Sequence, residues 1–423
     1  MPKTNFRWVI IGLLFVLNFI SYVDRSAIAF AVPNLMQTFH FNADQMGMIL
    51  GAFGIGYLIA TFFGGFLVDK WGSRLIILIF SLVWAFSIGF TAFIAGFLSA
   101  YLVRFCLGLG EGPNFPAVAR AVSDWLPEAS RGKALANSLV AVPLSLAIGA
   151  PIVSYLIIKM GWQMMFIVLA IAVLIAWPFY YFFFKNKPSE SRFVNQMELE
   201  FINQEKQVKK TDPNWQIILK NKTILSNNWG FFVYGYSMFF FLTWLPDFLE
   251  TSYHLNIKQV GLFSVLPWLL AAILLWSMGY ITDYIFAKTN KLRLARTYPI
   301  IIAQILTLLC IIPIVLWHNL TLTLICISLA VAFNLSNNTL FYSINIDVAK
   351  KNAATSLGIM NSGFAIAGFL APVITGLIIQ STGQFSSAFI LMAVLTFSAI
   401  VVMLLFHRPD AQSDHCLNTT ICN

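Results

Sequence analysis

The chain has 423 residues, of which 59% are hydrophobic and only 10% are charged. Soluble domains carry about 25% charged residues, so this composition excludes a soluble globular domain and indicates a polytopic membrane protein. The net charge of +9 does not indicate a nucleic-acid partner, because Lys and Arg are concentrated in the termini and in alternate polar loops. This distribution follows the positive-inside rule and predicts a multi-pass protein of the cell (inner or plasma) membrane with both termini cytoplasmic.

Apolar segments long enough to cross a bilayer recur along the chain and predict an all-α fold with twelve transmembrane helices. The first segment carries charges and lacks a small-residue cleavage site, so we interpret it as a retained helix. The five Cys are scattered without the spacing of a metal site, and we expect no metal and no cofactor. The twelve segments are 6–32, 45–68, 75–95, 97–122, 133–158, 162–184, 223–250, 257–282, 294–317, 319–346, 352–379 and 384–406.

The longest polar stretch divides these segments into two sets of six and predicts two pseudo-symmetric six-helix bundles. Within this stretch, Met197 to Val208 is read either as a short amphipathic helix on the cytoplasmic surface or as part of a solvated linker. The expected organisation is an N-terminal bundle over 1–184, a cytoplasmic linker over 185–222, a C-terminal bundle over 223–407 and a cytoplasmic tail over 408–423.

Two short motifs occur at corresponding places in the two halves. A Gly-x-x-x-Asp motif ends the second segment at residues 65–69 and the eighth segment at 279–283. An Ala-Pro pair lies in the fifth segment at 150–151 and in the eleventh at 371–372. Matching motifs in two six-helix halves are typical of a parallel-repeat transporter, whose substrate site lies between the halves near the membrane midplane.

Ionisable side chains inside apolar segments are costly and are therefore candidates for function. Arg104 and Glu111 are seven residues apart, so they lie on one helix face about 10 Å from each other. Asp24 and Arg25 lie in the first segment, and a depth count from segment ends at residues 32 and 97 places Arg25 level with Arg104. Two Arg and one Asp at this outer level leave a net positive charge that suits an anion. The alternative is a static ion-pair network that joins the two helices.

The same count places Glu111 about 10 Å deeper, where it predicts no Lys, Arg or His beside it. Desolvation disfavours a charged carboxylate, so such a group can take up a proton from one side and release it on the other. The alternative is a permanently protonated Glu111 bonded to a backbone carbonyl that the neighbouring Gly108, Gly110, Gly112 and Pro113 expose.

Longer motifs around these residues resemble a known family. The loop after the second segment reads Gly65-x-x-x-Asp69-Lys70-x-Gly72-x-Arg74, the hallmark of the major facilitator superfamily. More narrowly, the chain resembles the anion:cation symporter family, which includes bacterial sugar-acid and hexuronate permeases and animal sialin and vesicular glutamate carriers. The matching motifs are Tyr22-Val-Asp24-Arg25, Arg104…Gly108…Gly110-Glu111-Gly112…Phe115-Pro116, Trp125-Leu-Pro127…Arg131-Gly132, Trp244-Leu245-Pro246 and Gly358…Gly368…Pro372…Gly376.

The resemblance implies roles for individual residues. In this family the aspartate of the first helix and the glutamate of the fourth, here Asp24 and Glu111, are tied to proton coupling. The arginine of the fourth helix, here Arg104, binds the substrate carboxylate. A guanidinium offers a planar fork to a carboxylate and stays charged, so we expect both Arg25 and Arg104 to bind the anion.

The second half has no charged residue that can be placed at mid-membrane, so we expect it to supply neutral polar and aromatic contacts. Asn side chains in a membrane helix can instead bond neighbouring helices, and Tyr or Trp near helix ends can belong to the interfacial belt. Ala365 stands where several sugar-acid permeases carry a substrate-facing Asn, which favours a smaller or more apolar carboxylate. Further substrate-binding candidates are Tyr22, Tyr57, Tyr236, Trp244, Asn337, Asn338 and Asn361.

The hallmark loop predicts a gate at the cytoplasmic helix ends. The resemblance implies that Asp69 pairs with the inner end of segment 97–122, where Arg120 is the available cation, and with a helix N-terminus. Breaking this latch would favour the inward-open state, whereas the alternative is that the loop charges serve topology alone. The gating candidates are Gly65, Asp69, Lys70, Gly72, Arg74, Arg120 and Asp283.

Together these patterns predict a secondary active transporter that imports a small organic anion by proton symport through alternating access. The alternatives are a sodium-coupled or uncoupled organic-anion transporter or exporter and, from a different class, a transporter-like membrane sensor, which would need a sizeable extra soluble domain. No catalytic triad or metal motif indicates an enzyme. The expected partners are the substrate anion, protons and the lipid bilayer, and we expect a monomer.

Overall fold

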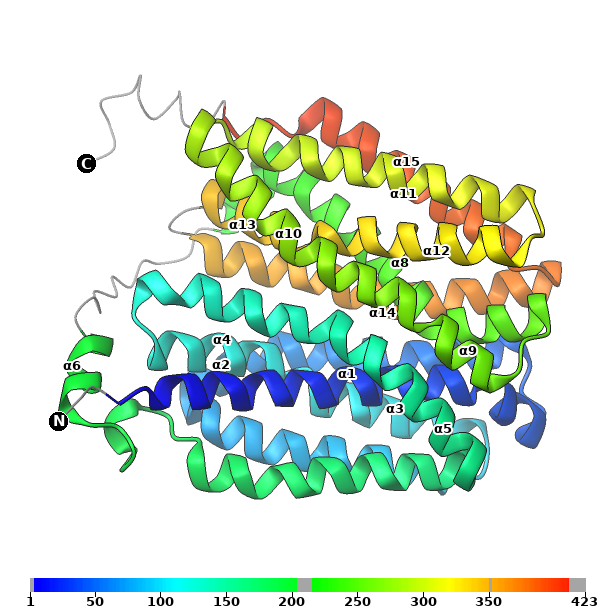
Figure 1. Ribbon diagram of the computed structural model, residues 1–423, viewed down its shortest axis with the longest axis horizontal. Coiled ribbons are helices and arrows are strands. Elements are labelled where there is room, and N and C mark those ends of the chain that lie inside the picture. Colours follow the sequence, from blue (N-terminus) through cyan, green and yellow to red (C-terminus); the bar gives the residue numbers. More distant parts are fainter. Residues whose placement is uncertain (1–3, 204–214, 350–351, 411–423) are drawn as a thin grey trace. The chain divides into compact units, whose positions relative to one another are not determined.

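Helices make up nearly all of the computed structural model, which describes residues 4–203, 215–349 and 352–410 (Figure 1). No strand occurs within these three ranges, and the prediction of an all-α fold is confirmed. Parts of the predicted linker and tail, residues 204–214 and 411–423, lie outside the described residues. The helices are α1 (Phe6–Phe39), α2 (Ala43–Thr91), α3 (Phe97–Glu111), α4 (Asn114–Trp125), α5 (Glu128–Phe183), η1 (Pro188–Glu190), α6 (Gln196–Asn203), α7 (Trp215–Lys220), α8 (Lys222–Tyr253), α9 (Ile257–Phe263), α10 (Val265–Thr289), η2 (Arg293–Thr297), α11 (Tyr298–Leu316), α12 (Leu320–Ser336), α13 (Asn338–Ala349), α14 (Ala353–Thr382) and α15 (Ser386–Phe406).

Within the described part of the chain, these helices make twelve membrane crossings. The long helices α2 and α5 each contain two crossings, which meet at Gly72 (φ 80°) and Gly161 (φ 81°). Only glycine adopts this left-handed backbone without strain, so each of these residues allows the chain to reverse direction. Four further crossings are formed by pairs of shorter helices, namely α3 with α4, α9 with α10, η2 with α11, and α12 with α13.

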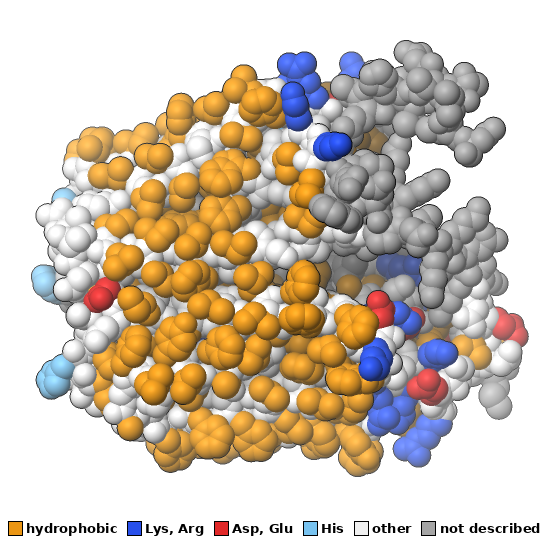
Figure 2. All heavy atoms as spheres, turned by 180° about the vertical axis from the view of Figure 1, so that it is seen from behind, with side chains coloured by type: hydrophobic (Ala, Val, Ile, Leu, Met, Phe, Trp, Pro, Cys, Tyr) orange, Lys and Arg blue, Asp and Glu red, His pale blue; other side chains and the backbone are white. Residues whose placement is uncertain are grey.

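The outer surface of the helices is apolar, as lipid requires. Hydrophobic side chains cover most of the face shown in Figure 2, and few charged side chains interrupt them. Phe62 and Phe93 are each 72% exposed, and Phe182 is 64% exposed. A continuous apolar surface of this extent is not stable in water, whereas it is favourable against acyl chains.

The chain packs as two compact units. The first unit comprises Met1–Lys209 with Thr243–Val265, and the second comprises Lys210–Leu242 with Leu266–Asn423, so that α8 is shared by both. The segment Thr243–Val265 thus packs with the first unit, although the sequence predicts it in the C-terminal bundle. The reason is the contact of α9 with α5, where Gly261 lies so close to Ser154 that a Cβ would collide with its side chain.

Helix caps recur in the two halves of the sequence and extend the internal repeat beyond the motifs found there. His40 ends α1 with φ 55°, and two residues later Asn42 opens α2 in a reciprocal capping box with Gln45. The same order recurs before α9, where His254 (φ 53°) is followed by the capping box of Asn256 and Gln259. A capping box satisfies two otherwise free N–H groups, so both helices begin at a defined residue.

A second recurrence braces the helix that follows each Gly-x-x-x-Asp motif. In the first unit, the Asn186 side chain accepts a hydrogen bond from the Arg74 backbone N–H (2.9 Å), and the Arg74 guanidinium donates to the Tyr181 carbonyl (2.9 Å). In the second unit, Asp410 accepts from the backbone N–H of Arg293 (3.0 Å). The Arg293 guanidinium donates to the carbonyl of Leu404 (3.4 Å). In each unit, hydrogen bonds therefore join the start of the helix after the motif to the end of the unit's last membrane crossing and the segment that follows it.

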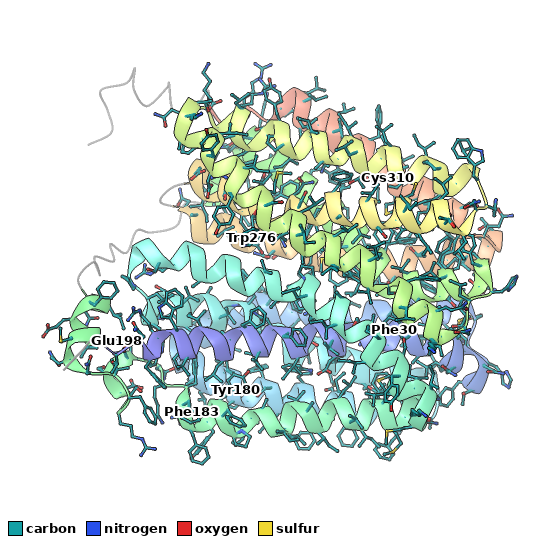
Figure 3. All side chains as sticks on the ribbon, in the orientation of Figure 1. Phe30, Tyr180, Phe183, Glu198, Trp276 and Cys310 are labelled. Atoms are coloured by element: carbon teal, nitrogen blue, oxygen red, sulfur yellow. The ribbon has the colours of Figure 1, made fainter. Side chains whose placement is uncertain are left out.

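The first part of the linker is docked to the first unit. Glu198 of α6 is fully buried at the N-terminal end of α1 (Figure 3). Its carboxylate accepts hydrogen bonds from the backbone N–H groups of Phe6 (3.1 Å) and Arg7 (3.2 Å) and forms an ion pair with Arg7 (2.8 Å). A carboxylate there satisfies free N–H groups and the helix dipole of α1. The sequence allowed either a short amphipathic helix or a solvated linker for Met197 to Val208. The structure has a helix that ends at Asn203, and residues 204–208 lie outside the described ranges.

Candidate functional site

A buried ion pair joins α1 to α3 in the core of the first unit. The Arg25 guanidinium donates to Glu111 Oε2 at 2.6 Å and 3.0 Å, and both side chains are almost fully buried. Ser21, four residues before Arg25 on α1, donates to the same oxygen at 2.9 Å. Glu111 Oε1 has no partner within the described residues, so one carboxylate oxygen holds the pair and the other is available.

This pair corrects two predictions from the sequence. Glu111 has a cation beside it, although none is predicted at its depth, and Arg25 does not lie level with Arg104. The physical reason is the length of α1, which continues to Phe39 instead of ending near residue 32. Arg25 precedes Phe39 by fourteen residues and Glu111 follows Phe97 by fourteen, so each lies about 21 Å from its helix end.

Arg104 is the buried cation that lacks a partner. It is 3% exposed, and within the described ranges its guanidinium makes no ion pair or hydrogen bond. The guanidinium carbon lies 5.3 Å from the centroid of the Phe53 ring, an interaction that supplies only part of the stabilisation lost on leaving water. A buried, unpaired guanidinium is a strong binding site for an anion that can reach it.

Asp24 has a neutral partner instead of a charged one. Its Oδ2 accepts a hydrogen bond of 2.9 Å from the indole N–H of Trp84, in the second crossing of α2. Its Oδ1 has no partner in the described structure, and the residue is fully buried. Of these four side chains of α1 and α3, Arg25 and Glu111 form an ion pair, whereas Arg104 and Asp24 have no ionic partner among the described residues.

Aromatic rings surround the Arg25 end of this cluster. The Arg25 guanidinium carbon lies 4.4 Å from the ring centroid of Tyr22, 4.6 Å from Phe53 and 5.0 Å from Tyr57. The structure thus brings the candidates Tyr22 and Tyr57 to the charged cluster. It adds Phe53, which contacts both arginines.

Glycines let α3 approach its neighbours backbone to backbone around Glu111. A Cβ at Gly108 would collide with the Phe53 carbonyl and would lie 2.7 Å from the Tyr57 nitrogen. A Cβ at Gly110 would lie 2.7 Å from the Trp84 nitrogen, and one at Gly112 would lie 2.6 Å from the Ala60 side chain. The glycine run therefore fixes Glu111 between the two crossings of α2.

The candidates in the second half of the chain differ in burial and in how well their polar atoms are satisfied. Asn337, between α12 and α13, is fully buried, and neither of its side-chain polar atoms has a partner within the described residues. Asn338 donates to the Tyr234 hydroxyl at 2.9 Å. Asn361 accepts from the Tyr342 hydroxyl (2.8 Å) and donates to the Leu357 carbonyl (2.9 Å), so both ends of its amide are used. Tyr236 and Trp244 are 2% and 0% exposed.

The charged residues at the helix ends form exposed ion pairs. Arg120 of α4 bonds Asp69 at 2.9 Å and Asp124 at 2.8 Å, as predicted for the contact between Asp69 and Arg120. In the second unit Asp283 pairs with Arg296 at 2.7 Å. The Asp69 and Asp283 side chains are 74% and 71% exposed, so these pairs contribute little stability and can break and reform.

The other gating candidates have different surroundings. Lys70 lies over the ring of Trp71 at 5.9 Å, and Gly65 has open space where a Cβ would be. Gly72 makes the turn, and Arg74 braces the end of α5 instead of joining Asp69.

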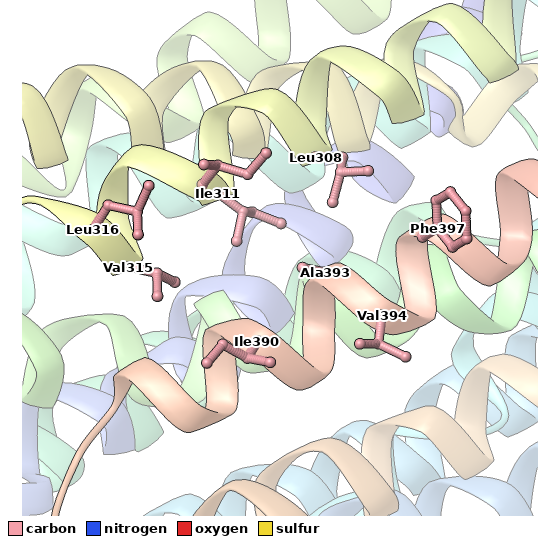
Figure 4. A pocket seen from close by; sticks show the side chains of 9 residues that line it. Leu308, Ile311, Val315, Leu316, Ile390, Ala393, Val394 and Phe397 are labelled. Atoms are coloured by element: carbon pink, nitrogen blue, oxygen red, sulfur yellow. The ribbon is translucent and has the colours of Figure 1, made fainter.

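A groove of about 370 Å³ in the second unit cannot be the anion site. It lies between α11 and α15 (Figure 4) and is lined by aliphatic and aromatic side chains alone. Without a donor or a positive charge it offers an anion no compensation for lost water. Acyl chains suit it better.

Sequence reasoning missed three residues of the charged cluster. Ser21 could have been found, because it lies one helical turn before Arg25 on the same face of the first segment. The sequence does not distinguish Trp84 and Phe53 from the other aromatic residues in the apolar segments. Their roles depend on which helices pack together.

Comparison with known proteins gives consistent matches over the whole length. The sequence profile of the Major Facilitator Superfamily matches residues 14–356 and 292–419. A probable sulfoacetate transporter of Cupriavidus necator is 32% identical over 394 residues, which cover 92% of this chain and 91% of that protein. The hexuronate transporter of Bacillus subtilis is 31% identical over 410 residues, which cover 95% of this chain and 94% of that protein.

A solved structure shares the fold. The crystal structure of a bacterial homologue of the human lysosomal transporter Spinster superposes with a TM-score of 0.78 over 97% of this chain and 99% of that one. At 14% sequence identity, this likeness concerns the fold alone.

Proposed function

Because the chain belongs to the Major Facilitator Superfamily, we propose that it is a secondary transporter that imports a small organic anion together with protons. The observation that carries the proposal is the buried, unpaired guanidinium of Arg104 beside the ion pair of Arg25 and Glu111. The proposed substrate group is a carboxylate or a sulfonate. The names of the two relatives, a sulfoacetate and a hexuronate transporter, support this class.

The ion pair supplies a mechanism for the proposed proton coupling. A proton on Glu111 removes the negative charge that holds Arg25, and the freed guanidinium can then bind the anion together with Arg104. When Glu111 loses its proton, it competes again for Arg25 and weakens the hold on the anion. Asp24, with one free oxygen, is the second proton-binding group.

Each unit also offers neutral side chains as candidate substrate contacts. Tyr22 and Tyr57 lie beside the charged cluster, and Asn337 has unsatisfied polar atoms that a ligand hydroxyl or carboxylate could use. Asn338, Asn361, Tyr236 and Trp244 remain candidates. Ala365 is fully buried and favours a smaller or more apolar anion than a sugar acid.

The pair of Asp69 and Arg120 is proposed as the reversible latch at the cytoplasmic ends of the helices. This placement follows the positive-inside orientation, with both termini cytoplasmic. The transporter would work in the cell membrane as a monomer, by alternating access of two six-helix halves.

Uptake by the purified protein in proteoliposomes tests the function. Labelled sulfoacetate, a hexuronate and small aliphatic and aromatic carboxylates are offered with an inward proton gradient, with an inward sodium gradient and with neither. We expect at least one anion to accumulate with the proton gradient and to leak out when a proton ionophore is added. Accumulation that follows sodium instead, or that follows neither gradient, would contradict proton coupling.

A further inference from the structure

Trp84 is a buried residue to which neither the motifs nor the family resemblance assigns a role. It lies in the second crossing of α2, is 3% exposed, and donates its indole N–H to Asp24 Oδ2 at 2.9 Å. The indole nitrogen is a donor only, so it can bond the carboxylate but can never take its proton. The carbonyl oxygen of a carboxylic acid accepts better than its hydroxyl oxygen, so this donor favours a proton on Oδ1, which is buried and has no partner in the described structure.

The backbone around Trp84 is fixed by its neighbour helix. At Gly110 the backbone of α3 approaches so closely that a Cβ would lie 2.7 Å from the Trp84 nitrogen and 2.9 Å from its Cα. Glu111 is the next residue of α3. Trp84 therefore touches one carboxylate through its side chain and stands directly beside the helix turn that carries the other.

We propose that Trp84 is a positioning residue for proton coupling, which holds Asp24 Oδ2 through its indole N–H and leaves Oδ1 as the oxygen that takes up and releases the proton. This inference rests on the proposed proton-coupled function. An N–H donor to a carboxylate stabilises its charged form, so Trp84 also sets the pH at which Asp24 is loaded.

Other ionisable groups belong to the same buried cluster. They are Arg25 and Tyr22 on α1, Glu111 and Arg104 on α3, and Tyr57 on α2. The Glu111 carboxylate is close enough to repel Asp24. The hydroxyl of Tyr180 on α5, which packs along α1, is bonded to the Leu13 carbonyl, eleven residues before Asp24. Trp84 differs from all of these groups because it is neutral at every pH.

The test replaces Trp84 by Phe, which keeps an aromatic ring and removes the N–H. Uptake driven by a proton gradient is measured as a function of external pH for the wild type, Trp84→Phe, Asp24→Asn and the double variant. We expect Trp84→Phe to shift the pH of half-maximal uptake upward by roughly one unit, because the charged carboxylate loses a donor. In the Asp24→Asn background, the same change should leave the pH profile where it is.

Trp177→Phe is the matched control. The Trp177 indole also donates to the second crossing of α2, but to the backbone carbonyl of Leu78 at 2.9 Å. Its loss should leave the midpoint unchanged. Identical profiles for the wild type and Trp84→Phe, an equal shift with Trp177→Phe, or an equal shift in the Asp24→Asn background would each overturn the role of Trp84.

Different results would refute the proposed proton coupling and the role of Trp84. Wild-type uptake that ignores pH and gradient refutes the proposed coupling and the role of Trp84 together, whereas wild-type coupling with no effect of Trp84→Phe refutes the role of Trp84 alone. If Trp84→Phe does not fold, ¹⁵N-indole-labelled wild type and Asp24→Asn replace it. The chemical shift of one indole signal should then change with pH around the midpoint of uptake in the wild type and should stay constant in Asp24→Asn. A wild-type spectrum in which no indole signal changes with pH would overturn the inference.

Discussion

At the scale of single residues, the proposed site concentrates its charge chemistry in four buried side chains of α1 and α3. Replacing a buried ion pair by apolar residues is often neutral or stabilising, so stability does not explain why Arg25 and Glu111 are charged. Arg104 has no partner in the described part of the chain and is harder still to explain as a structural residue. The proposed anion, bound between the two guanidinium groups, would account for both.

Arg104 should be indispensable for transport. Arg104→Ala removes the charge and is expected to lower uptake by at least about 30-fold, the usual cost of truncating a buried charged partner. Arg104→Lys keeps the charge but loses the planar fork, so little uptake should remain. Initial uptake rates in proteoliposomes measure both, with Arg293→Lys as the control at a site that contacts only backbone and ring. Near-normal uptake by Arg104→Lys would contradict bidentate binding.

Glu111→Gln should separate accumulation from exchange. The amide cannot release a proton, so gradient-driven accumulation should be lost, while exchange of labelled for unlabelled anion continues. Glu198→Gln is the matched control, because it also removes a buried carboxylate that pairs with an arginine, 2.8 Å away, outside the proposed site. Both variants should lose thermal stability. Accumulation that survives in Glu111→Gln, or disappears equally in Glu198→Gln, would return Glu111 to a structural role.

The sequence identifies the charged residues but not their partners. Asp24, Arg25, Arg104 and Glu111 stand out because each is ionisable inside an apolar segment. Their pairing depends on relative depth, and an error of seven residues in the end of the first helix moves Arg25 by about 10 Å. A small error in a helix boundary therefore leads to the wrong ion-pair partner, even when the helix itself is predicted correctly.

At the scale of helices, the close approach of α3 to α2 should tolerate no side chain. Gly108→Ala places a Cβ against the Phe53 carbonyl, and backbone atoms cannot move aside as a flexible side chain does. Overpacking of this kind costs about 1–3 kcal/mol. Gly12→Ala, in open space on α1, is the control and should be neutral or slightly stabilising. Thermal unfolding of the purified variants compares them, and equal midpoints would contradict the backbone packing.

The end of α15 should make stability depend on pH. His407 is fully buried with its Nδ1 bonded to Thr297 at 2.8 Å, and burial, together with the nearby Arg293, lowers the pKa of its imidazole to about 3. Unfolding restores the ordinary value, so the unfolded chain gains a proton below pH 6.5. This contribution to stability is complete above that pH and falls by about 2 kcal/mol between pH 7 and pH 5.

His407→Gln removes this titration and keeps an acceptor for Thr297. The unfolding free energy of the variant should therefore fall less than that of the wild type over the same pH interval. Chemical denaturation at pH 5, 6 and 7 gives both values. Parallel pH curves for the two proteins would show that His407 does not carry the dependence.

Helix positions were predictable because hydrophobic length is a strong signal in membrane proteins. Breaks within a crossing were less accessible, since Gly112-Pro113 and Asn337 separate short helices that the apolar pattern presents as one segment. The paired His, Asn and Gln caps are visible in the sequence as His-x-Asn-x-x-Gln at residues 40–45 and 254–259. Recognising them would have strengthened the internal repeat.

At the scale of the whole molecule, the predicted family and fold are confirmed. The profile match and the relatives place the chain among major facilitator transporters and not among enzymes. Substrate identity does not follow from the fold, and in our proposal it depends on a few neutral side chains such as Asn337. The proposed proton coupling likewise depends on the protonation of Glu111 and Asp24, which the twelve-helix architecture does not determine.

Proton movement during transport tests the central claim most directly. The purified protein is placed in proteoliposomes that contain a pH-sensitive dye, and the anion found by the uptake screen is added outside without any imposed gradient. Import of the anion with protons predicts that the interior becomes acidic on substrate addition, and that Arg104→Ala and Glu111→Gln abolish this signal. Accumulation of the labelled anion with no change of internal pH would contradict the account.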